Sequence, residues 1–142
     1  MKTIQKLFQD CHSIPKIELH AHIGGSIRPE TFLELAESKR ISVDNLDFYN
    51  VDIKMAFEIF KVGSKLVTDL PTLKRIVKEV IVDYSKHNTR YLELRSTPKE
   101  FPNTSKSDYV DTVIEAIKEE EENNSLIKVR LLLSVNRLMN EE

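Results

Sequence analysis

Residues 14–23 form the feature that most constrains the fold of this chain. Apolar and polar side chains alternate along the run, with Ile17, Leu19, Ala21 and Ile23 on one side and Glu18, His20 and His22 on the other. A period of two is typical of a β-strand. Gly24-Gly25-Ser26 ends this strand, and Pro29-Glu30 is typical of a helix start. A strand that turns directly into a helix predicts the opening of a βαβ unit.

The rest of the chain continues the alternation of strands and helices. Residues 41–54 are aperiodic and rich in Asp and Asn, which indicates a loop. Apolar side chains recur at helical spacing in three later stretches, 56–62, 71–84 and 108–122. We expect three strands in all, near 16–23, 90–96 and 127–135. Two consecutive βαβ units predict an α/β fold with a parallel sheet and right-handed crossovers.

Length and charge exclude several classes of protein. The chain of 142 residues is long enough for one domain with a core and too short for two, so we expect a single domain over residues 1–142. Lys and Arg total 21 against 23 Asp and Glu, so the sequence offers no basic surface for nucleic acid or an anionic membrane. No stretch approaches the roughly 18 apolar residues of a membrane-spanning helix. Cys11 is the single cysteine, which favours a reducing compartment, and we expect a cytoplasmic protein.

Charged residues also follow a pattern along the predicted strands. Each strand carries its charges on one side, at Glu18, Glu93, Arg95, Lys128 and Arg130. Buried charges cost several kcal/mol unless they are paired, so we expect a cluster of paired charges on the sheet face opposite the helices. Residues 118–122 form an acidic run after one Lys, which we interpret as a solvated helix end.

His20-Ala21-His22 places two imidazoles on the same side of a strand, with Cβ atoms about 6–7 Å apart. One ring nitrogen of each His can then reach a single ion at roughly 2.0–2.1 Å, so the pair can form half of a metal site. The pair lies at the carboxyl end of a strand, which is the functional edge of parallel α/β folds. The alternative is a pair of structural histidines. A catalytic zinc site usually has three protein ligands and a water, so two ligands do not complete it.

Ser96-Thr97-Pro98-Lys99 closes the second predicted strand at the same edge of the sheet. Its hydroxyls, free backbone N–H groups and Lys could hold a phosphate or a carboxylate. The alternative is an ordinary turn with a solvated surface Lys.

Two motifs together resemble the adenosine/AMP deaminase family. Residues 15–26, Pro-Lys-Ile-Glu-Leu-His-Ala-His-Ile-Gly-Gly-Ser, followed by Arg-Pro-Glu-Thr at 28–31, resemble the opening signature of the family. Residues 91–99, Tyr-Leu-Glu-Leu-Arg-Ser-Thr-Pro-Lys, look like the second-strand motif of its N(6)-methyl-AMP deaminase branch. The resemblance covers essentially the whole chain.

The resemblance implies a fold, a cofactor and a site. The family fold is a TIM (β/α)8 barrel of the metal-dependent hydrolase type, which takes roughly 250 residues, so this chain would be its N-terminal part of about three βα units. By resemblance, His20 and His22 are ligands of one Zn²⁺ ion, which this chain alone would ligate incompletely. Substrate contacts are implied at His22, Gly24, Ser96, Thr97, Pro98 and Lys99.

The implied function is hydrolytic deamination of a small-molecule purine nucleoside or nucleotide, namely adenosine, AMP or N(6)-methyl-AMP. The family takes its third His ligand and its catalytic Glu from later strands, so we expect no catalytic residue in this segment and no activity of the chain alone. We expect a full-length enzyme to be a monomer. Two alternatives stay open: a related metallohydrolase with another substrate, and a short non-catalytic form that acts as an interaction module.

Four positions depart from the pattern of the branch: Gly24 where the family has Asp or Asn, Ser64 where a His is typical, Lys99 for Arg, and Asn136 for Asp. Lys in place of Arg keeps the positive charge but loses the bidentate geometry that suits a phosphate. These departures bear on which purine the site would accept.

Overall fold

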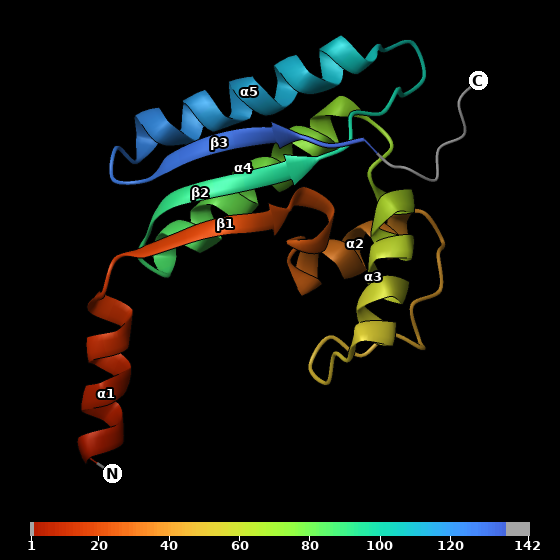
Figure 1. The fold of residues 1–142 in the computed structure, drawn as a ribbon. Coiled ribbons are helices and arrows are strands. Elements are labelled where there is room, and N and C mark those ends of the chain that lie inside the picture. Colours follow the sequence, from red (N-terminus) through yellow and green to blue (C-terminus); the bar gives the residue numbers. More distant parts are fainter. Residues whose placement is uncertain (1, 136–142) are drawn as a thin grey trace.

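The computed structural model describes residues 2–135. Its elements follow one another as α1 (Lys2–Ser13), β1 (Lys16–His22), the 3-10 turn η1 (Ile23–Gly25), α2 (Pro29–Ser38), α3 (Ile53–Leu66), α4 (Leu70–Lys86), β2 (Thr89–Ser96), α5 (Lys106–Asn123) and β3 (Lys128–Leu133) (Figure 1). Asn136, one of the four departures named above, lies outside the described residues.

The sheet contains three parallel strands in the order β1-β2-β3 (Figure 1). The chain passes from β1 to β2 through α2, α3 and α4, and from β2 to β3 through α5. Because the strands are parallel, their carboxyl ends meet at one edge, where η1 and the loop after Ser96 lie. The predicted α/β class with a parallel sheet is confirmed.

The hydrophobic core lies between the sheet and the helices α4 and α5. Leu92 and Leu94 of β2 are fully buried. They face a buried stripe of α4 made of Leu73, Ile76, Val77, Val80 and Ile81. The spacing of this stripe keeps one face of the helix on the sheet, and each such side chain stabilises the fold by about 1.5–3 kcal/mol.

Polar caps decide where the longer helices begin. The side chains of Asp52, Asp69 and Ser105 accept hydrogen bonds from backbone N–H groups in the first turns of α3, α4 and α5. Those N–H groups have no partner inside the helix, so a capping oxygen at this position is stabilising. The helices therefore begin one to three residues before the stretches predicted for them, at Ile53, Leu70 and Lys106.

Helix α1 was not predicted from the sequence. It extends away from the sheet (Figure 1). Its side chains Ile4, Leu7 and Phe8 are exposed. Neither α1 nor another helix among residues 2–135 has the length and apolar content needed to cross a bilayer.

The predicted cluster of paired charges opposite the helices does not form within residues 2–135. Lys128 and Arg130 instead each lie 3.6 Å from the carboxylate of Glu121, which belongs to α5. Glu93 accepts a hydrogen bond from the hydroxyl of Tyr91 at 3.1 Å. The prediction was wrong because β3 lies at the edge of the sheet, where its charges stay partly solvated and can pair with a helix.

The acidic run at the end of α5 was predicted to be a solvated helix end, but two of its carboxylates are paired with lysines of α4. Glu119 lies 2.7 Å from the ammonium of Lys74 and 3.0 Å from that of Lys78, both on α4. Glu120 is only 8% exposed and lies 3.3 Å from Lys78. These pairs join the two helices that cover the sheet, although exposed ion pairs typically contribute only about 0–1 kcal/mol each.

Candidate functional site

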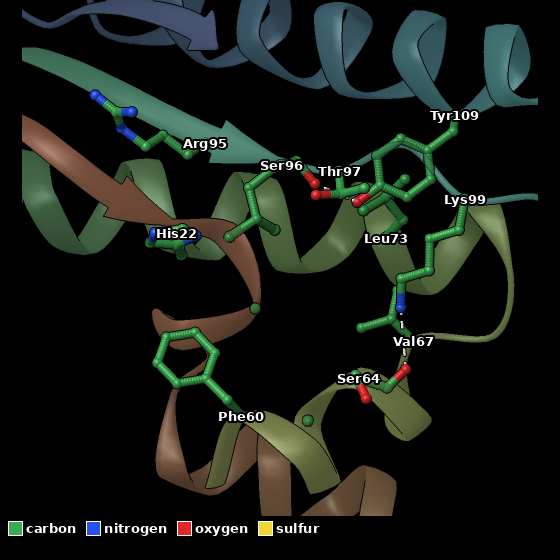
Figure 2. Close-up of a pocket in the computed structure, with 13 residues that line it drawn as sticks. His22, Phe60, Ser64, Val67, Leu73, Arg95, Ser96, Thr97, Lys99 and Tyr109 are labelled. Atoms are coloured by element: carbon green, nitrogen blue, oxygen red, sulfur yellow. Dashed lines mark hydrogen bonds between the residues drawn. The ribbon is translucent and has the colours of Figure 1, made fainter. Parts of the chain in front are cut away.

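A cavity of about 340 Å³ opens at the carboxyl edge of the sheet (Figure 2). Its walls come from the end of β1 and η1, from α3, from the end of β2 with the loop that follows, and from the early turns of α4 and α5. This volume is at the lower end of the range for small-molecule sites. Five of the predicted site residues line it, namely His22, Gly24, Ser96, Thr97 and Lys99. His20 and Pro98 are not among the lining residues.

The imidazoles of His20 and His22 converge, with their Nε2 atoms 3.2 Å apart and their ring centroids 5.2 Å apart. Two nitrogens bound to one tetrahedral zinc ion at roughly 2.0–2.1 Å are about 3.3 Å from each other. The same separation suits an N–H···N hydrogen bond when one ring carries its proton on Nε2. The two donor atoms therefore fit two positions of a zinc site. Within residues 2–135, no group of three or more His, Cys, Asp and Glu side chains gathers to hold an ion.

The surroundings of His22 favour the neutral imidazole that binds metals. Partial burial, followed by the nearby charges of His20 and Arg95, lowers the pKa of His22 below its usual value. Arg95 is the partner of His22 in the ladder between β1 and β2. The ring of Phe60, on α3, meets the imidazole of His22 edge-on, with the ring centroids 5.9 Å apart.

The two adjacent glycines of η1 have different surroundings. A Cβ added at Gly25 would run into the ring of Phe60, so a larger residue would displace the ring that borders His22. A Cβ added at Gly24 would meet nothing within 4 Å. The position at which the family pattern has Asp or Asn therefore has space for such a side chain.

The alternative for residues 96–99 was an ordinary turn with a solvated surface Lys, but Lys99 is not fully solvated. Its side chain is partly buried in the cavity wall, and its Nζ donates a hydrogen bond to the backbone oxygen of Ser64 at 3.0 Å (Figure 2). Burial lowers the pKa of the Lys99 ammonium below its usual value. A positive charge thus lies beside position 64, on the side of the cavity opposite the strands.

The hydroxyls of Ser96 and Thr97 are held by neighbouring side chains. Ser96 Oγ and the hydroxyl of Tyr109 form a buried hydrogen bond of 2.7 Å. Burial raises the pKa of Tyr109 above its usual value. Thr97 Oγ1 lies 3.0 Å from Ser134 Oγ, just after β3. The β2 end of the cavity is therefore built from fixed polar groups.

Among the lining residues that sequence reasoning did not assign to the site are Phe60, Arg95 and Tyr109. Its place in the strand could have found Arg95, because it directly precedes Ser96 at the carboxyl end of β2. Tyr109 belongs to the first turns of the helix after β2, and such turns also lie at the carboxyl edge of a parallel sheet. No sequence signal marks Phe60, since it follows the apolar spacing of α3.

Comparison with known proteins finds clear relatives. The family model described as "Adenosine deaminase" matches residues 15–142. An N6-methyl-AMP deaminase of Danio rerio is 37% identical over 134 residues, which cover 87% of this chain and 38% of that protein. An N6-mAMP deaminase of Arabidopsis thaliana is 40% identical over 116 residues, covering 75% and 33% of the two chains.

A solved structure agrees with these relatives. The crystal structure of Arabidopsis ADAL complexed with GMP superposes with a TM-score of 0.77 and 38% sequence identity, over 91% of this chain and 43% of that chain. The chain therefore spans about two fifths of the length of the curated and solved relatives that it matches.

Proposed function

This chain belongs to the adenosine deaminase family, and from that premise we propose that it supplies the first metal ligands and part of the nucleotide pocket of a hydrolytic purine deaminase. Its parallel βα units correspond to one part of the TIM-type barrel found in its solved relatives. The observation that carries the proposal is the convergence of His20 and His22, with Nε2 atoms 3.2 Å apart, beside a cavity that also holds Lys99.

The proposed metal is one Zn²⁺ ion held by Nε2 of His20 and Nε2 of His22. When bound, zinc supplies the Lewis acidity that hydrolytic removal of an amino group from a purine requires. The lowered pKa of His22 supports this role, since only a neutral imidazole has a free electron pair for a metal. The proposal includes no catalytic acid or base among residues 2–135.

The proposed substrate is a purine nucleoside monophosphate such as AMP or N(6)-methyl-AMP. The relatives named above are N6-methyl-AMP deaminases, and a solved relative is complexed with GMP. We assign the phosphate to Lys99 and to the hydroxyls of Ser96 and Thr97, because a partly buried ammonium strengthens its hydrogen bonds to an anion. His22 and Gly24, which line the cavity, would then border the sugar and the base.

The 142-residue polypeptide is proposed to form one incomplete domain and not to deaminate purines by itself. Only two candidate metal ligands converge within residues 2–135, whereas a catalytic zinc site usually takes three from the protein. A cytoplasmic location and a monomeric complete enzyme belong to the same proposal, and the lone thiol of Cys11 is compatible with a reducing compartment.

A metal titration of the purified chain tests the central part of this proposal. Co²⁺ is added at pH 8, and its visible absorption is recorded for the unchanged chain and for four single His→Ala variants. We expect His20→Ala and His22→Ala to lose binding, and His12→Ala and His87→Ala to keep it. Equal binding by all four variants would contradict the proposed site. Release of methylamine from N(6)-methyl-AMP by the 142-residue chain would contradict its proposed inactivity.

The exposed apolar side of α1 favours a second candidate function, an interaction module without catalysis. Ile4, Leu7 and Phe8 are 62–78% exposed. Under this alternative the chain alone would be a monodisperse, cooperatively unfolding monomer that fails to bind Co²⁺ through His20 and His22. Size-exclusion chromatography with light scattering, combined with the titration above, separates the two functions.

A further inference from the structure

The ladder between β1 and β2 is irregular immediately before the His pair. Glu18 is the partner of Leu92 and Ala21 is the partner of Leu94, so a step of three residues on β1 faces a step of two on β2. Leu19 and His20 have no partner in this ladder, which is the arrangement of a β-bulge. A bulge bends its strand and redirects the side chains that follow it. Here the bulge includes His20 and lies two residues before His22.

Two side chains bind the backbone groups that the bulge frees. The carboxylate of Glu18 accepts a hydrogen bond from the backbone N–H of His20 at 2.8 Å. From the neighbouring strand, Nη2 of Arg95 donates to the backbone oxygen of Leu19 at 3.4 Å. Both contacts are exposed, so they replace hydrogen bonds to water and hold the bulge in one conformation. The Leu19–His20 peptide is thus fixed from both of its ends.

The positive charge of Arg95 gives no reason for an Arg side chain beside the proposed metal ligands. Its side chain lies beside His22, where a permanent positive charge opposes a bound metal cation. Its Nε is buried and has no hydrogen-bond partner among residues 2–135, which adds a desolvation cost. The contact with the Leu19 oxygen is the hydrogen bond that the side chain of Arg95 makes within the described residues.

We propose that Glu18 and Arg95 are positioning residues, which hold the Leu19–His20 bulge so that the Nε2 atoms of His20 and His22 stay at the spacing a single metal ion requires. This inference rests on the proposed function, since it concerns the same His pair. It assigns to the two residues a role in geometry, and neither is assigned as a metal ligand or as a substrate contact.

Amide hydrogen exchange tests the bulge without any metal. NMR measures the exchange rate of the His20 N–H in the unchanged chain, in Glu18→Ala and in Glu18→Gln. Loss of one hydrogen bond corresponds to an increase of about 10-fold, so we expect that increase in Glu18→Ala. The amide oxygen of Gln can still accept, so Glu18→Gln should stay near the unchanged rate. Equal exchange in all three proteins would overturn the proposal.

Co²⁺ affinity at pH 8 tests the consequence for the metal pair. Loss of a group that orients a metal ligand typically weakens binding by about 10–100-fold, and we expect at least 10-fold for Glu18→Ala and Arg95→Met. Glu18→Gln should bind as the unchanged chain does, and Arg95→Lys should recover part of the loss. Arg130→Met, which removes a charge from β3 that is 59% exposed, is the matched control and should have no effect.

The sign of the effect separates geometry from charge. If charge alone mattered, Arg95→Met would bind Co²⁺ more tightly because a cation has been removed, and Glu18→Gln would bind more weakly. Either result would overturn the positioning role. Urea unfolding of each variant shows that it is folded, and Arg95→Lys serves if Arg95→Met is not. If the unchanged chain fails to bind Co²⁺ but His20 exchange still depends on Glu18, the metal site is wrong and the bulge assignment stands.

Discussion

We propose that the positively charged side chain of Lys99 binds the phosphate of the substrate. Replacing it with Met should weaken AMP binding to the metal-loaded chain by about 10–100-fold, the range of a charge-assisted hydrogen bond, and leave adenosine binding unchanged. Burial lowers the pKa of Lys99, so its ammonium loses its proton at a lower pH than an exposed Lys does. As the pH rises, the preference for AMP over adenosine should decline at that lower pH. Calorimetric titration with both ligands measures this difference, and Lys106→Met, at an exposed position, is the control. An equal loss for AMP and adenosine would contradict the assignment.

Gly24 and Gly25 provide a matched pair at the mouth of the cavity. Gly24→Asp should change the free energy of unfolding by less than about 0.5 kcal/mol, because its added atoms enter open space. Gly25→Ala should displace Phe60, since the new Cβ would collide with its ring. Urea unfolding measures the first effect, and the ring-current shift of the His22 proton resonances reports the second. A large destabilisation by Gly24→Asp, or unchanged His22 resonances in Gly25→Ala, would contradict the geometry of η1.

At the scale of elements, Arg28 joins the start of α2 to the end of α4 through two hydrogen bonds to Asp83, at 2.5 and 2.8 Å. The hydrogen bond from Arg28 holds the pKa of Asp83 below its usual value, so the stabilisation is present above the unfolded pKa of about 3.9 and is lost as pH falls through the folded value. Because the pair is partly exposed, we expect Arg28→Met to cost about 1 kcal/mol at pH 7 and less at pH 2, since the stabilisation declines as the pH falls from about 3.9 toward the lowered pKa of Asp83. Urea unfolding at both pH values checks this, with Lys54→Met, at an exposed position on α3, as the control. The same cost at both pH values would exclude the pair as its source.

Apart from α1, the elements whose pattern is local could be predicted from the sequence, whereas contacts between elements could not. The alternation around His20 and the helical spacing of α4 each depend on neighbours along the chain, and both gave the correct type of element. The bulge at Leu19 was not predictable, because it depends on register with β2. The cavity residues missed by sequence reasoning, such as Tyr109, follow an ordinary helical pattern and reach the site only through packing. The charge pattern of β3 failed as a predictor because it does not show which strand lies at an edge.

At the scale of the whole molecule, the sheet described by residues 2–135 has two outer strands, β1 and β3, and an unpaired strand edge is a template for association. On β1, Ile17 and Leu19 are 69% and 54% exposed, so an apolar surface accompanies the open edge. We expect the purified 142-residue chain to form oligomers that bind the dye ANS, and Leu19→Lys to shift it toward monomer without lowering the free energy of unfolding. Leu33→Lys, a 46% exposed position on α2, is the matched control and should not change the oligomers. Size-exclusion chromatography with light scattering at several concentrations measures both variants. A monomer at every concentration would show that the edge of β1 does not drive association, and would favour the interaction-module alternative.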